Sequence, residues 1–160
     1  MLEHMTWTDR LGTNVVRFSK RALKEGGAQL FVEIASRETD AWVVHRTFKE
    51  VVNTCGFDLV LDTYMDESWT LTDVDNDGFA EVTIAYTADC TSDVSPNKHK
   101  VLVLHKGVKY ALRGVSKVDA GAALTGGQYK VDAAFEKAPA GLLEHAKKVW
   151  EATASASLVR

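Results

Sequence analysis

The sequence lacks the features that mark membrane-spanning and nucleic-acid-binding proteins. No apolar run approaches the roughly 20 residues that a transmembrane helix needs, so we expect no membrane-spanning segment. The 19 lysines and arginines are scattered rather than gathered in a basic block, and the formal net charge is -3. Nucleic acid is therefore not expected as a partner.

The sequence also lacks the short motifs of common enzymes, because it holds no G-x-S-x-G, Walker or G-x-G-x-x-G pattern. The histidines beyond residue 5 are widely spaced and form no recognisable ligand pair. We therefore expect no enzymatic activity. The alternative is a hydrolase, because paired carboxylates about 5–9 Å apart can cleave glycosides. Its carboxylates would be the loop aspartates together with Asp58, Asp62, Asp66 and Glu67.

Cysteine is scarce, since Cys55 and Cys90 are the only two. One disulfide in an oxidising compartment and two buried free thiols in the cytosol both fit this count. A disulfide would close a loop of about 36 residues and stabilise the fold by roughly 3–4 kcal/mol. Without a CxxC or HxxxH spacing, the pair cannot form a zinc site alone.

The two ends are expected to lie outside the fold. The first five residues, MLEHM, look like a cloning remnant and are left out of the fold prediction, so a missing secretory leader says little about compartment. The tail SASLVR, residues 155–160, is expected to be loose. A single β-rich domain is predicted over residues 6–154, since 160 residues with 46% hydrophobic content suit one core.

The predicted fold class is mainly β, of the α+β type: an antiparallel sheet or sandwich with one C-terminal helix. A hairpin is expected over residues 100–114, a long loop over 114–129 and a helix over 139–154. Residues 47–55 fit a strand or a short helix. The remaining predicted strands cover residues 14–21, 28–38, 41–48, 57–64, 68–73 and 80–88.

The segment TDVDNDGFAE, residues 72–81, predicts a calcium site. Calcium takes six to eight oxygen ligands, which alternating aspartates around a glycine bend can supply. Position twelve is Ile84 and the exit is a strand, so the loop is no EF-hand; it resembles the D-x-D-x-D-G-x-x-[DE] loops of integrin-type propeller blades. The expected ligands are Asp73, Asp75, Asp77, the carbonyl of Phe79, and Glu81.

The alternative for this loop is an acidic turn whose side chains bond their own backbone without an ion. Three carboxylates within five residues repel one another unless a cation offsets them, which favours calcium. The ion is expected to be structural, since no general base is evident beside it.

A second polar loop, residues 89–100, follows Cys90 and is a candidate for recognition, because loops on a rigid sheet often carry binding residues. Its candidate partner-binding residues are Asp89, Asp93, Ser95 and Lys98. Aromatic side chains could instead stack sugars, but their positions on apolar faces predict core packing for Trp69, Tyr86, Tyr110 and Trp150.

Five motifs occur in a fixed order between residues 7 and 114: W-T-D, C-G-F-D, T-D-V-D-N-D-G-F-A-E, Y-x-x-x-C-x-x-D-V-S-P-x-x-x-K and K-Y-A-L-R-G. In this order they resemble a family of small bacterial envelope proteins with a signal or lipoprotein leader, some of them named surface-polysaccharide-biosynthesis proteins. The resemblance implies that Cys55 and Cys90 form a disulfide. It also favours the periplasm or cell envelope, with a lipid anchor as one option.

Together these features predict a non-catalytic periplasmic binding domain that calcium and a disulfide stabilise. Its expected partner is a protein, for example a toxin acting in the envelope that this chain would inhibit as an immunity protein, or a component of envelope assembly. The alternative is an accessory or glycan-binding role in surface-polysaccharide biosynthesis, which predicts exposed aromatics beside the aspartate loop.

Overall fold

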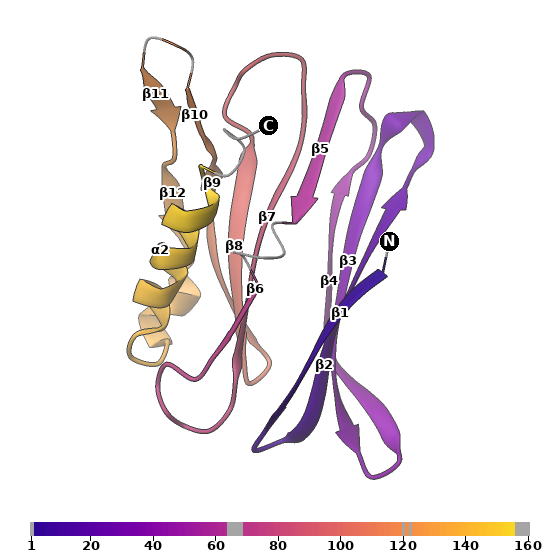
Figure 1. Cartoon of the computed structure of the whole chain (residues 1–160), viewed down its shortest axis with the longest axis vertical. Coiled ribbons are helices and arrows are strands. Elements are labelled where there is room, and N and C mark those ends of the chain that lie inside the picture. Colours follow the sequence, from indigo (N-terminus) through magenta and orange to yellow (C-terminus); the bar gives the residue numbers. More distant parts are fainter. Residues whose placement is uncertain (1, 64–68, 120, 122, 156–160) are drawn as a thin grey trace. The chain divides into compact units, whose positions relative to one another are not determined.

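The computed structural model describes residues 2–63, 69–119, 121 and 123–155 (Figure 1). Antiparallel strands and one α-helix make up most of it, which confirms the predicted mainly β, α+β class. The chain divides into two compact units, Met1–Leu59 and Val60–Arg160, and each is described by itself.

The first unit is a four-stranded antiparallel sheet in the order β1-β2-β3-β4. Its strands form because alternate apolar side chains share one face, and Val16, Leu30 and Val32 are fully buried. The strands are β1 (Leu2–Asp9), β2 (Gly12–Ala22), β3 (Ala28–Glu38) and β4 (Ala41–Val52).

One prediction for this unit needs correction, and one open alternative is decided in favour of a strand. Residues 2–5, which the sequence analysis left out of the fold, belong to β1, and the register runs on to Leu2 opposite Ser19. The segment 47–55 contains no helix, because β4 continues to Val52 opposite Ala28. The apolar spacing of this segment fitted a strand or a helix, and pairing with β3 makes it a strand.

The second unit holds most of a larger antiparallel sheet in the order β12-β9-β8-β7-β5, with β6 also pairing with β7. The β8–β9 turn has positive φ at Lys106 and Gly107 (46° and 75°), the conformation of a tight hairpin turn. The strands are β5 (Asp58–Thr63), β6 (Trp69–Thr72), β7 (Glu81–Thr91), β8 (Lys98–His105), β9 (Val108–Val115) and β12 (Tyr129–Val131).

Helix α2 (Leu142–Thr153) packs against this sheet, as Figure 1 shows beside β9 and β12. The predicted apolar stripe is confirmed, since Leu142, Ala146, Val149 and Trp150 lie in the core with strand residues such as Val101. A 3-10 turn, η2 (Ala133–Lys137), precedes it and contributes Phe135 to the same core. No helix in the described residues is long and apolar enough to cross a membrane.

The long loop predicted over residues 114–129 is wrong in part. Short strands β10 (Lys117–Asp119) and β11 (Leu124–Gly126) pair there. Each strand has 3 residues, too few for a periodic pattern to be recognised in the sequence. Gly126 and Gly127 have φ near 84°, a conformation that suits glycine. Residues 156–160 of the tail expected to be loose lie outside the described residues.

Candidate metal centre

Three strand ends of the second unit meet at the aspartate loop, which joins β6 to β7 at the lower end of the sheet in Figure 1. Thr72, the last residue of β6, pairs with Glu81, the first of β7. Val82 pairs with Leu104 of β8, so the next register position sets His105 beside Glu81. The sheet register therefore brings the loop and the β8–β9 hairpin together.

Hydrogen bonds from the loop backbone orient its carboxylates. Asp73 accepts from the N–H groups of Asp77 (2.9 Å) and Gly78 (3.0 Å), and Asp75 accepts from Asp77 (3.2 Å). Positive φ at Asn76 (58°) and Gly78 (83°) turns the chain back on itself. The same bonds are those expected of an acidic turn whose side chains bond their own backbone.

Glu81 is fully buried, and its carboxylate holds the start of the loop. Oε2 accepts from the Thr72 hydroxyl (2.9 Å) and from the Val74 N–H (3.0 Å). Val74 in turn packs against the core under α2. A buried carboxylate is unfavourable unless hydrogen bonds and a counter-charge compensate it.

One oxygen from each of Asp73, Asp75 and Glu81 lies within 4.8 Å of the others. Calcium–oxygen distances of about 2.3–2.6 Å allow ligand oxygens to lie up to about 5 Å apart across one ion. The cluster therefore has the dimensions of a cation site. Phe79 lies in the same loop, where its N–H donates to Asp77 Oδ1 (2.8 Å), and the role of its carbonyl as a ligand stays a prediction.

A second group combines Asp75, Asp77 and His105. His105 Nε2 lies 3.3 Å from Asp77 Oδ2 and 3.9 Å from Asp75 Oδ2, and Nδ1 lies 3.8 Å from Glu81 Oε1. The spacing of residues in the sequence did not identify His105 as a candidate ligand. The signal that could have found it is the strand register, since the H-K-G turn ends β8 beside the first residue of β7.

Lys106 places a positive charge on the loop. Its ammonium pairs with Asp77 and lies 4.4 Å from the ring centroid of Phe79. The Lys106 hydrogen bond is the largest cause of a lowered pKa at Asp77. One lysine offsets one of four carboxylate charges, so the cluster keeps a strong attraction for cations.

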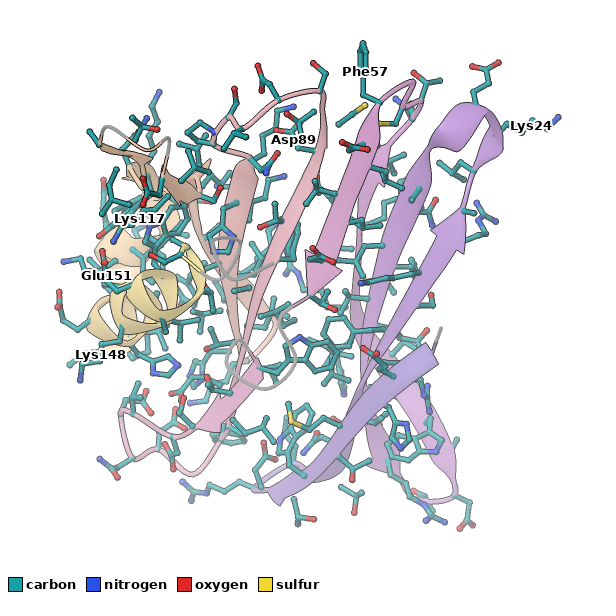
Figure 2. The ribbon with its side chains drawn as sticks, turned by 45° about the horizontal axis from the view of Figure 1, so that its top comes forward. Lys24, Phe57, Asp89, Lys117, Lys148 and Glu151 are labelled. Atoms are coloured by element: carbon teal, nitrogen blue, oxygen red, sulfur yellow. The ribbon has the colours of Figure 1, made fainter. Side chains whose placement is uncertain are left out.

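The predicted disulfide is confirmed, because Cys55 and Cys90 are bonded to each other. The polar loop after Cys90 lies at the other end of β7 from the aspartate loop, and Figure 2 labels Asp89 there. Ten residue steps along a strand separate the two ends by about 30 Å.

The four candidate partner-binding residues are in two situations. Asp89 and Lys98 bind each other, by the Lys98 N–H to Oδ2 (3.0 Å) and by Nζ to Oδ1 (3.0 Å). Burial raises the pKa of Asp89, but these hydrogen bonds outweigh it and the net pKa is lowered. Asp93 and Ser95 are exposed, so this half of the loop faces solvent.

The remaining candidates separate into core and surface. The four aromatic residues expected in the core are buried, with Trp69, the most exposed of them, at 9%. Asp58 and Asp62 lie on β5, whereas Asp66 and Glu67 of the hydrolase alternative lie outside the described residues.

A comparison with models of protein families found no match, and comparisons with curated proteins and with solved structures found none either. The resemblance to small envelope proteins therefore stays a prediction.

Proposed function

We propose that this chain is a non-catalytic binding domain whose aspartate loop holds a structural calcium ion. The observation that carries the proposal is the convergence of Asp73, Asp75 and Glu81 within 4.8 Å, with Glu81 fully buried. Carboxylate oxygens are the ligands that calcium prefers, and backbone carbonyls or water complete its shell. The ion would offset a buried negative charge at the junction of β6 and β7.

The partner is proposed to be a protein that adds to the sheet of the first unit. Strand β4 is the last strand in the described order of that sheet, and an extended segment of the partner is proposed to pair with it. Trp42, Val43 and Val44 on this strand are 42%, 38% and 47% exposed. Successive side chains point to opposite faces, so apolar surface flanks the edge on both sides.

An immunity-type inhibitor of a toxin acting in the envelope is the concrete form of this proposal. The disulfide supports an oxidising compartment, for which we propose the periplasm or cell envelope. The exposure of Trp42, at 42%, supports the glycan-binding alternative, but the burial of Trp69 weakens it. The latter lies four residues before the aspartate loop and is buried, so it offers sugars no platform.

The calcium part is tested by thermal unfolding in excess calcium and in chelator, with Asp75→Asn and the matched control Asp40→Asn. Asp40 is an exposed turn residue outside the loop. Wild type and the control should melt higher in calcium, and Asp75→Asn should lose most of that rise. No rise in wild type, or an equal rise in all three proteins, would exclude a calcium ion held by Asp75.

The binding part is tested by capture from an envelope extract with wild type and with Val43→Lys, which places a charge on the exposed edge strand. A specific partner should be lost with Val43→Lys and kept with Lys130→Gln, a surface control on β12. A partner that both variants retain equally would exclude β4 as the binding edge.

A further inference from the structure

We propose that the aspartate loop and the β8–β9 hairpin also form a site for a borderline transition-metal ion, such as zinc, with Asp75, Asp77 and His105 as ligands. This site differs from the all-oxygen set of Asp73, Asp75 and Glu81 in its nitrogen ligand, and it shares only Asp75 with that set. It does not rest on calcium binding, since imidazole with carboxylates suits zinc, whereas calcium takes oxygen.

The state of His105 is the observation that points to a ligand. The side chain is only 4% exposed, both ring nitrogens face carboxylates, and Nδ1 is buried without a hydrogen-bond partner. Buried polar atoms in folded proteins are nearly always satisfied, so an unsatisfied nitrogen inside an acidic cluster needs an explanation. A cation bound at the other ring nitrogen supplies one.

The distances between ligand atoms fit a small ion. Zinc binds histidine nitrogen and carboxylate oxygen at about 2.0–2.2 Å, which places neighbouring tetrahedral ligand atoms about 3.4 Å apart. His105 Nε2 lies 3.3 Å from Asp77 Oδ2 and 3.9 Å from Asp75 Oδ2. Both histidine–carboxylate distances are therefore within about half an ångström of this spacing, and the three ligand atoms lie within 4.8 Å of one another.

Glu81 would support the histidine from its other side. With an ion on Nε2, His105 carries its proton on Nδ1, which faces Glu81 Oε1 at 3.8 Å. A slight approach makes this contact a charge-assisted hydrogen bond, the arrangement that commonly orients a metal-bound histidine. The unsatisfied Nδ1 thus becomes a donor.

Two neighbours compete with this site. Lys106 pairs with Asp77 and must leave it, which its long and half-exposed side chain permits. Calcium bound by Asp73, Asp75 and Glu81 would also use Asp75 as a ligand, so calcium and zinc should compete for the loop. The opposing explanation is that His105 only packs beside the carboxylates as part of the fold and binds no metal.

Zinc and calcium affinities measured by titration calorimetry distinguish these explanations. His105→Gln should weaken zinc binding at least about tenfold and change calcium affinity less than threefold. Asp73→Asn should do the reverse, because Asp73 belongs to the all-oxygen set alone. The control is His45→Gln, an exposed residue of β4. Zinc affinity in His105→Gln within twofold of wild type overturns the proposal.

A measurement on wild type covers the case in which His105→Gln fails to fold. Zinc should shift the Nε2 nitrogen resonance of His105 in a nitrogen-15 spectrum of the histidine rings. A shift at other histidines with His105 unchanged would overturn the proposal. Zinc binding at His105 without any calcium effect would sink the calcium proposal and leave this one standing, and calcium binding without zinc would do the opposite.

Discussion

The backbone N–H of Val74 donates to the buried carboxylate of Glu81 at 3.0 Å and joins the two ends of the aspartate loop. Because the bond lies where β6 and β7 pair, the loop is closed by the sheet itself. An ion bound in the loop should therefore raise the stability of the second unit against unfolding.

Glu81→Gln should remove most of the calcium-dependent rise in melting temperature. In chelator this variant should melt no lower than wild type, because it removes a buried charge and keeps an oxygen to accept from Val74 and Thr72. Differential scanning fluorimetry in calcium and in chelator measures both effects. A variant with the full calcium response would remove Glu81 from the ligand set.

Lys106→Gln should raise calcium affinity about three- to tenfold, because it removes the positive charge that pairs with Asp77. Lys130→Gln removes the same charge from β12 and should change the affinity less than twofold. Calorimetry at low ionic strength gives the comparison, since salt screens such effects. Equal calcium affinities in wild type, Lys106→Gln and Lys130→Gln would contradict the view that the charge of Lys106 weakens calcium binding at the loop.

His99 should make stability depend on pH. Its ring nitrogens bind Thr87 and Thr153 (2.9 and 3.0 Å), and burial lowers its pKa from 6.5 to about 4. Between these values the unfolded chain binds a proton that the folded chain does not. The stability due to neutral His99 is thus complete above pH 6.5 and is lost as the pH falls towards 4.

Urea unfolding between pH 4 and 7 measures this dependence. The loss should be on the order of 3 kcal/mol for wild type. His99→Gln should have a flatter slope, whatever its absolute stability, and the exposed control His45→Gln should keep the wild-type slope. A slope unchanged by His99→Gln would mean that another group titrates.

Reduction of the disulfide should destabilise the protein by about 3–4 kcal/mol, the entropy that cross-linking Cys55 to Cys90 removes from the unfolded chain. Urea unfolding with and without reductant measures the loss in wild type. The variant with both cysteines replaced by serine should unfold at the same urea concentration with and without reductant. A wild type that unfolds identically in reductant would show that the bond contributes no net stability.

Local patterns predicted much of the fold and part of the site. The helix stripe around Trp150 and the strand alternation of β3 repeat over enough residues to be recognised. The aspartates lie within one short loop, so their clustering follows from spacing alone. His105 lies 24 residues after Glu81, and only the pairing of β7 with β8 brings the two together. Short β10 and β11 carry too few residues for periodicity.

The bond between Cys55 and Cys90 makes residues 55–90 a covalent ring, and the aspartate loop is part of that ring. A protease that cuts once within the loop would therefore add one water to the molecule and release no fragment. The nick would stay invisible on a non-reducing gel until reductant separates the two pieces. In an environment rich in proteases, a chain cleaved at its aspartate loop would remain one molecule.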